Sequence, residues 1–217
     1  MPRPRFACAR RRAASCRRAA LLLASGLGAA LAASAFTVNI SPGPRALYMV
    51  VGNGSMSGRY DSGGTPGNNT TVNTVSASVT AANLGGGPVA MTTNSSTTNS
   101  LYDNFTFCSV PAEVYVGGFF RAPGAVGSAS LTVTAPSNLV SGSNLLPFST
   151  ISWQSGGNGD LVPTIPSGTF VGGAAQTLLA VPANTWFESC LAFRYANGSV
   201  PAAGTYTGRA TYTLTAP

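Results

Sequence analysis

Five carboxylates are the side chains of residues 36–217 best suited to acid–base chemistry: Asp61, Asp103, Glu113, Asp160 and Glu188. The sequence contains no histidine and no lysine, which removes the usual general base, the commonest metal ligand and the amine nucleophile. Neither a Ser-His-acid or Cys-His arrangement nor a zinc constellation can therefore be assembled.

Two of these acids, Asp160 and Glu188, could meet in space as the acid–base pair that a glycoside hydrolase requires. Each is interpreted more simply as a solvated loop acid or as the partner of an arginine. Asp61 lies in an Asp-Ser-Gly triplet that occurs only once, whereas aspartic-protease chemistry needs two acids that share a proton. The sequence therefore predicts a protein that is not an enzyme, with no catalytic residue, no cofactor and no metal site.

The first 35 residues have the pattern of a cleaved signal peptide. Seven of the twelve arginines fall in the first 18 residues, an uncharged apolar run follows, and cleavage is expected between Ala35 and Phe36. The run is about 16 residues long, short of the ~20 that span a bilayer, so a membrane anchor is the weaker alternative. We expect a secreted protein of the periplasm, cell surface or extracellular space, with no integral membrane span in the mature chain.

Removal of the leader also removes the basic character. Residues 36–217 keep five arginines, equal in number to the acids: Arg45, Arg59, Arg121, Arg194 and Arg209. Because nucleic-acid binding needs clustered positive charge, this balance excludes it.

Cys8 and Cys16 leave with the leader, and Cys108 and Cys190 remain. In an oxidising compartment a disulfide between them is the expected state, with two free buried thiols as the alternative.

The elements that must position these residues are strands, because the hydrophobic pattern of the mature chain has a period of two. Segments rich in β-branched and aromatic residues are bounded by Gly, Pro, Asn or Ser, and no capped amphipathic helix is evident. The expected strands cover residues 35–40, 46–51, 71–80, 105–110, 112–120, 128–135, 148–153, 176–181, 185–195 and 205–216. This pattern predicts an all-β fold, an antiparallel β-sandwich or a barrel.

Residues 52–69 and 84–100 are expected to form long loops, with glycosylation sequons at Asn94 and Asn104. Five aromatic residues could build a carbohydrate-stacking platform, although core packing is the commoner role: Trp153, Trp186, Tyr115, Phe119 and Phe120.

Two segments repeat one another, GSASLTVTAP at residues 127–136 and GRATYTLTAP at residues 208–217. The repeat allows an internal duplication with a boundary near residue 137. We nevertheless expect residues 36–217 to form a single domain, because one cysteine in each half suggests that the halves are tied together.

The last segment alternates strictly between a polar and an apolar face. Thr or Arg occupies every odd position from 205 to 215, which suits a solvated face. The expected core face consists of Tyr206, Gly208, Ala210, Tyr212 and Leu214.

The final stretch, SVPAAGTYTGRATYTLTAP, resembles the C-terminal strand of spore-coat-U-type proteins and archaic chaperone–usher pilins of bacteria. The segment AFTVNISP is similar to the donor strand at the N-terminus of those pilins, although their early cysteine is absent here. The resemblance covers about the first ten mature residues and the last thirty. It implies an Ig-like, pilin-like sandwich with an open groove, which a neighbour's strand fills through Phe36, Val38 and Ile40.

Two functions follow as hypotheses. The first is a structural or adhesive surface subunit of the pilus or coat type, assembled by strand donation with copies of itself or related subunits and delivered by a periplasmic chaperone. The second is a monomeric extracytoplasmic module that binds a glycan or a protein. The sequence leaves open whether residues 36–40 pair within their own chain, as a first strand, or with the next chain.

Overall fold

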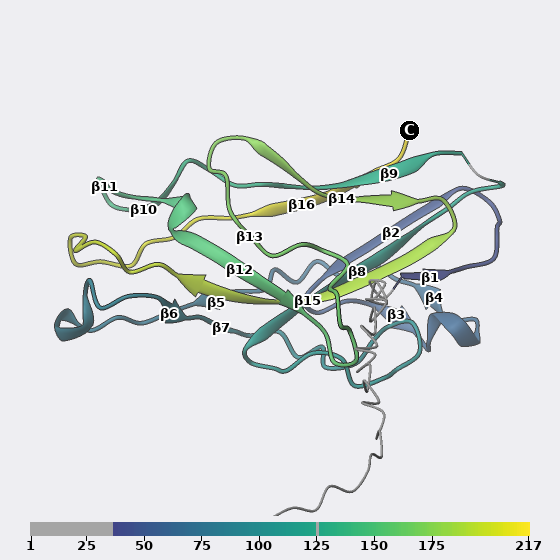
Figure 1. Cartoon of the computed structure of the whole chain (residues 1–217), viewed down its shortest axis with the longest axis horizontal. Helices are drawn as coiled ribbons and strands as arrows, with labels where there is room; N and C mark the ends of the chain where they lie inside the picture. The colour runs from purple at the N-terminus through teal and green to yellow at the C-terminus, as the bar shows by residue number, and fades with distance from the viewer. Residues whose placement is uncertain (1–36, 125) are drawn as a thin grey trace, which may run out of the picture. The chain divides into compact units, whose positions relative to one another are not determined.

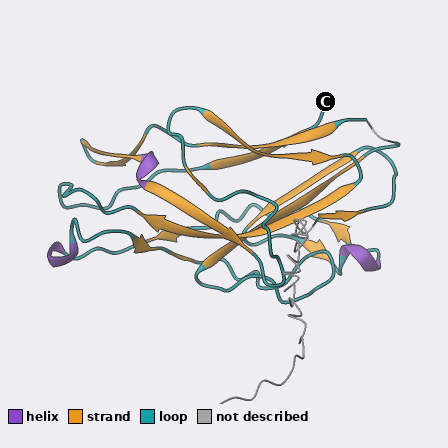
Figure 2. Ribbon diagram, viewed as in Figure 1, coloured by secondary structure: helices purple, strands orange, loops and turns teal. Residues whose placement is uncertain are grey.

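Strands provide nearly all the regular structure of the residues that the computed structural model describes, 37–124 and 126–217 (Figure 2). The helical elements in this part of the chain are three short 3₁₀ segments: Tyr60–Ser62, Ala81–Asn83 and Phe148–Thr150. The all-β prediction is therefore confirmed. None of the helices described is long and apolar enough to cross a membrane.

Two antiparallel sheets face each other. The larger has the order β13 (Gly168–Thr169), β12 (Ile151–Gly156), β15 (Thr185–Tyr195), β8 (Glu113–Arg121) and β2 (Ala46–Val51), with β1 (Thr37–Asn39) and β6 (Val89–Ala90) also paired to β15. The smaller has the order β14 (Ala175–Pro182), β9 (Ser128–Thr134) and β16 (Thr211–Thr215).

Three two-stranded ladders complete the description: β10 (Asn138–Ser141) with β11 (Asn144–Pro147), β3 (Met56–Ser57) with β4 (Thr65–Pro66), and β5 (Val75–Ser76) with β7 (Thr92–Thr93). Figure 1 shows the small sheet on one side of the large sheet, and the short strands β3, β4, β5 and β7 on the other.

The central strands β8 and β15 are buried on both faces because hydrophobic layers lie on each side. Val116, Phe120 and Leu191 enter the core between the two sheets. Phe119 and Trp186 enter a second core, beneath the loops and short strands of residues 52–111. This double burial explains why the sequence of both strands is almost continuously apolar.

Several expected strand boundaries are correct, and others are wrong. Strands β2 and β15 begin and end as expected, but the segment 71–80 contains only the two-residue β5, and 105–110 belongs to no named strand. Local side-chain bonds compete with strand pairing in the first of these segments, since the Thr74 N–H donates to Asn94 Oδ1. In the second, the N–H groups of Phe107 and Cys108 both donate to the Thr98 carbonyl.

The repeated segments lie side by side as neighbouring strands. In the small sheet β9 and β16 pair antiparallel, with Thr134 opposite Thr211 and Ser130 opposite Thr215. Their similar Thr-rich, alternating sequences thus serve one sheet, in which both strands turn alternate residues to the same core.

Replacing Gly118 with alanine is expected to lower the free energy of unfolding by about 1–3 kcal/mol. Gly118 pairs with Met49, and a Cβ at this position would overlap the Tyr48 carbonyl oxygen of β2. Gly156→Ala is the matched control, because a Cβ there meets no atom within 4 Å. Urea denaturation of the two variants measures the difference, and equal midpoints would contradict the packing described here.

Candidate functional site

Glu188 is fully buried at the centre of β15, which corrects the expectation of a solvated or arginine-paired acid. Its Oε2 accepts hydrogen bonds from Tyr115 (2.6 Å), Ser100 (3.0 Å) and the Trp186 indole N–H (3.1 Å). Its Oε1 is buried with no hydrogen-bond partner among the described residues. Burial raises the pKa of Glu188, and it also raises the pKa of Tyr115, with the Glu188 charge adding to the effect.

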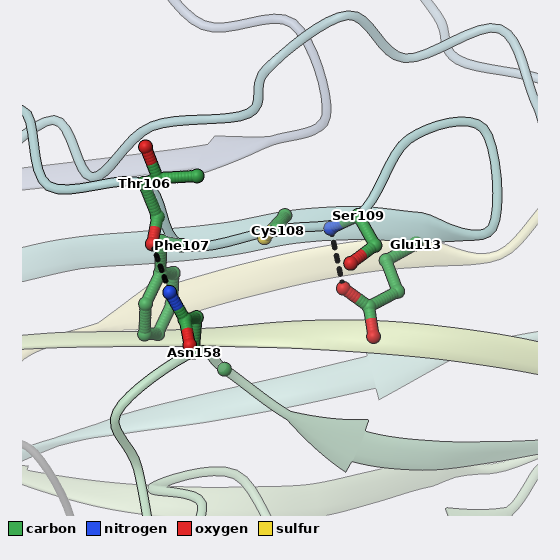
Figure 3. Close-up of a pocket in the computed structure, with 7 residues that line it drawn as sticks. Thr106, Phe107, Cys108, Ser109, Glu113 and Asn158 are labelled. Carbon is green, nitrogen blue, oxygen red and sulfur yellow. Dashed lines mark hydrogen bonds between the residues drawn. The ribbon is translucent and has the colours of Figure 1, made fainter.

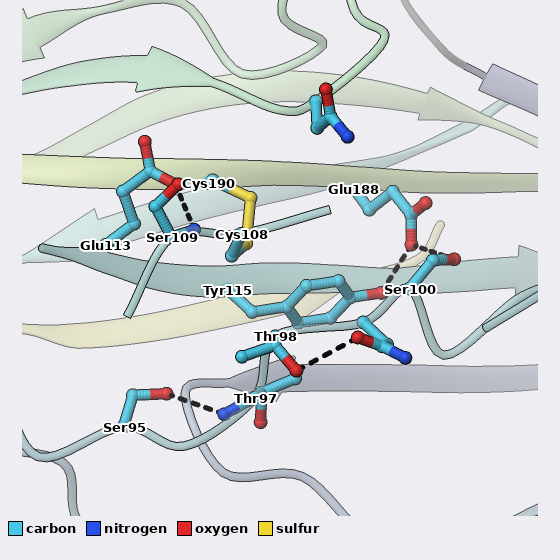
Figure 4. The surroundings of a disulfide bond; sticks show 12 residues. Ser95, Thr97, Thr98, Ser100, Cys108, Ser109, Glu113, Tyr115, Glu188 and Cys190 are labelled. Carbon is cyan, nitrogen blue, oxygen red and sulfur yellow. Dashed lines mark hydrogen bonds between the residues drawn. A yellow bond between two sulfur atoms is a disulfide. The ribbon is translucent and has the colours of Figure 1, made fainter. Parts of the chain in front are cut away.

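This cluster connects the loop that carries Ser100 to the large sheet. Ser100 Oγ accepts the backbone N–H of Tyr102 (3.0 Å) while it donates to Glu188, and the Leu101 N–H donates weakly to the Tyr115 hydroxyl (3.5 Å). Figure 4 shows the Tyr115 hydroxyl and Ser100 meeting at the Glu188 carboxyl. With no exposed surface, Glu188 cannot contact a substrate in this conformation, and its contacts are those of a structural anchor.

Asp160 is not joined to Glu188 by a hydrogen bond. It follows β12 in a turn where its N–H donates to the Gly157 carbonyl (3.0 Å), and its Oδ2 is buried without a hydrogen-bond partner among the described residues. Burial raises the pKa of Asp160 to about 6. The acid–base pair considered from the sequence is therefore not assembled here.

The expected aromatic platform is part of the interior. Trp153, Trp186, Tyr115, Phe119 and Phe120 are each at most 4% exposed. Trp186 instead packs among other rings, with centroids 5.0 Å from Tyr60 and 5.9 Å from Phe119. The exposed aromatic side chain that the sequence did not single out is Phe105, which is 54% exposed.

The predicted disulfide between Cys108 and Cys190 is confirmed, with the two Cα atoms 5.5 Å apart. It joins the segment 98–111 to β15, beside Tyr115 and Glu113 (Figure 4). Cys108, Cys190 and Glu113 bring their ligand atoms within 4.8 Å of one another, but the two sulfurs are bonded to each other and offer no thiolate to a metal.

A hollow of about 330 Å³ opens beside this bond, and we call it the disulfide hollow. It is lined by residues 106–109, Glu113, Gly157 and Asn158. Asn158 and Glu113 flank Cys108 in Figure 3. Asn158 donates from its side chain to the Thr106 carbonyl (3.0 Å), and Glu113 Oε2 accepts the Ser109 N–H (2.7 Å). The lining is mainly polar and can hold a charged group, and no basic side chain contributes to it.

The segment proposed as a donor strand is seated in its own chain. Strand β1 pairs antiparallel with β15, Val38 lies opposite Trp186, and Val38 and Ile40 both contact the second core. Phe36 and the expected cleavage after Ala35 lie outside the described residues. Strand β1 therefore borders β15, whereas the terminal strand borders β9.

The terminal strand is shorter than the twelve residues expected. Residues 211–215 pair with β9 as β16, whereas Thr207 exchanges two backbone hydrogen bonds with Val140 of β10. The chain changes partners near Gly208, where a Cβ would approach Phe148 and Leu139 to 2.8 Å. The alternation itself persists: Tyr206, Ala210, Tyr212 and Leu214 are half-buried against the main core, whereas Gly208 is exposed.

Comparisons of the chain with protein-family models, with curated proteins and with solved structures found no match.

Proposed function

We propose that the chain is a secreted structural or adhesive surface protein of the pilus or coat type, with an Ig-like, pilin-like sandwich that assembles by β-strand addition. The observation that supports this most directly is the position of β16 at the edge of the small sheet. Within the described residues β9 is the named strand that pairs with it, and no ladder forms at its second edge, although β16 also lies close to β2 of the large sheet.

An edge of this kind suits strand addition for two reasons. Its backbone can extend the ladder, and its apolar residues Tyr212 and Leu214 are only half-buried, so an added strand would cover them further. Full burial of an exposed side chain of this size contributes about 1.5–3 kcal/mol, and covering the part of Tyr212 and Leu214 that is still exposed contributes a fraction of that. Both contributions favour association over an isolated chain.

The donor in this proposal is the segment 36–40 of another copy. In the single chain β1 has only three register pairs with β15, and Pro42 and Pro44 follow within five residues of its end. Release of so short a strand is a small cost compared with release of the eleven-residue β15. Related subunits and a periplasmic chaperone are the partners that would protect the open edge before assembly.

Deletion of residues 36–40 tests the assignment, with the full-length chain expressed behind its own leader and recovered from the periplasm. We expect the unaltered protein to form species larger than a monomer by native chromatography, and the deletion to abolish them while thermal unfolding remains cooperative. Thr37→Ser with Asn39→Ser is the matched control, because both side chains are exposed and the anchors Val38 and Ile40 remain.

The alternative is a monomeric module that binds a glycan or a protein, and the cis pairing of β1 favours it. Ile40 is 7% exposed, and its N–H donates to the Asn184 carbonyl (2.9 Å), as an internal strand would require. A monomeric wild type whose deletion variant unfolds would establish this alternative and overturn strand donation.

A further inference from the structure

We propose that copies of the chain dock head to tail, with Arg209 of one copy entering the disulfide hollow of the next beside Glu113. This inference rests on the proposed function, because it names surfaces through which copies would meet in an assembly. The hollow lies next to the turn that follows β12, whereas Arg209 lies between Thr207, which is bonded to β10, and the first residue of β16. In Figure 1 the β10–β11 hairpin projects at one end of the sheets, away from the loop that descends after β12.

The hollow is an acidic site without a cation. The Glu113 carboxylate lies at its wall, and Asp160 lies in the adjoining turn, where its Oδ2 is 3.2 Å from the position that a Cβ on Gly157 would take. Among the described residues the ion pair is Arg59 with Asp61 (3.4 Å), so neither of these acids has a cationic partner. A carboxylate with unused acceptor positions is best satisfied by a guanidinium, whose N–H groups can bond it in pairs.

Exposed apolar side chains lie next to the lining of the hollow in the sequence, and the Phe105 ring is 3.7 Å from the position that a Cβ on Gly159 would take. Phe105 is 54% exposed, Leu161 86% and Val162 44%, and we call these three residues the apolar rim. Two hydrogen bonds from Asn158, to the carbonyls of Phe107 (2.9 Å) and Thr106 (3.0 Å), hold the turn after β12 against the segment that carries Phe105. Exposed apolar residues around a charged pocket are typical of a binding surface for protein.

The surface around Arg209 is basic, whereas the disulfide hollow is acidic. Arg209 is exposed and makes no hydrogen bond or ion pair with the described residues. It follows Thr207, which is bonded to Val140 in both directions (2.8 and 3.0 Å). Val140 is 43% exposed and Leu145, opposite it in the hairpin, is 60% exposed. A free cation on the segment that borders this exposed apolar pair thus complements the free acids and the apolar rim.

Two different surfaces that complement each other produce a heterologous contact. Such a contact leaves each surface free at one end of a pair, so further copies can be added and an open chain results. The interaction between Glu113 and Arg209 is an exposed one, and it should weaken as salt is added.

Charge reversal at each surface tests the proposal. We expect Glu113→Arg alone and Arg209→Glu alone to weaken self-association of the periplasmic protein by about tenfold in sedimentation velocity. An equimolar mixture of the two variants should restore association, because each variant then offers the other a complementary surface. Arg194→Glu is the matched control, since Arg194 is also exposed and without a partner among the described residues but lies on β15.

A folding defect is separated from a lost contact by two further measurements. Glu113→Gln keeps an acceptor for the Ser109 N–H and removes only the charge, so it should weaken association without lowering the melting temperature. If self-association recovers in the mixture of Glu113→Arg and Arg209→Glu, both variants must be folded, because a misfolded variant would not offer a complementary surface. Association of both reversal variants at the level of Arg194→Glu would overturn the docking proposal and leave strand donation standing. A wild type that stays monomeric would overturn both.

Discussion

Replacement of Cys108 and Cys190 by alanine is expected to lower the free energy of unfolding by about 4 kcal/mol. The bond closes a loop over a sequence separation of 82 residues, and in the chain-entropy description a loop of this length restricts the unfolded chain by about that amount. Alanine is preferred to serine, because both sulfurs lie in an apolar cluster where a hydroxyl would lack a partner.

Urea denaturation of the double variant and of the oxidised wild type measures this loss. Wild type that has been unfolded, reduced and refolded under reducing conditions is the control, and its stability should match that of the double variant. A loss below about 1 kcal/mol would show that the segment 98–111 is held by other contacts. Those contacts would be Phe107 in the second core and the two hydrogen bonds to the Thr98 carbonyl.

The strands that the sequence predicts well are those whose side chains are sorted by burial. The bounds of strand β15 are predicted correctly, because a segment rich in aromatic residues ends at an Ala-Asn-Gly sequence typical of turns. The large sheet is covered on both sides, and a strand buried on both faces gives an unmistakable apolar run. Sequence pattern alone is sufficient in such a case.

The segments predicted poorly are those where side chains bond the backbone. Asn53 Oδ1 accepts the Ser96 N–H (2.7 Å), and Asn73 Oδ1 accepts the Asn53 N–H (2.8 Å), so residues 52–98 form an ordered polar layer with few ladders. The sequence around Asn197 predicts a turn. The residue is nevertheless only 1% exposed, and its side-chain amide donates to the carbonyls of Asn83 (2.9 Å) and Gly87 (3.1 Å). These partners are 110 or more residues away, and no local pattern indicates them.

The candidate sites, like the strands, include some features that the sequence predicts and others that it does not. The disulfide follows from counting cysteines, but the hollow beside it depends on a turn after β12 meeting the segment 105–109. The acid Glu188 could not be distinguished from the other four carboxylates in the sequence, because its environment comes from Ser100 and Tyr115, on separate segments. The Thr-rich face of the terminal strand was predictable, whereas the partner change near Gly208 was not, since it depends on the position of Phe148.

Removal of the Glu188 side chain is expected to cost about 3 kcal/mol or more. Glu188→Ala leaves the Tyr115 hydroxyl, the Ser100 hydroxyl and the Trp186 indole N–H without their common acceptor in a buried cluster. Each unsatisfied buried donor costs about 1–3 kcal/mol, and the cavity adds to this. Chemical denaturation at pH 7 measures the loss, and Glu113→Ala serves as the comparison, because its carboxylate accepts a single N–H at the surface.

Glu188→Gln tests the charge of this side chain separately from its hydrogen bonds. Burial raises the pKa of Glu188 in the folded protein above the ordinary value of 4.5, so the folded state binds its proton more tightly than the unfolded state does. The stability contributed by that proton is fully present below pH 4.5 and is lost as the pH rises through the raised pKa. The glutamine variant lacks this loss, and it should gain stability relative to wild type as the pH increases from 4 to 8.

Asp160→Asn separates the pH dependence of stability that is due to Glu188 from that due to Asp160, the second carboxyl with a raised pKa. The pKa of Asp160 is raised to about 6 from 3.8, so its contribution is lost as the pH rises through about 6 and becomes constant only well above that pH. The decline of wild-type stability that is due to Glu188 should therefore persist in Asp160→Asn and disappear in Glu188→Gln. A glutamine variant whose stability follows the wild-type pH profile throughout would show that Glu188 keeps its charge in the folded protein, stabilised by the three donors at Oε2.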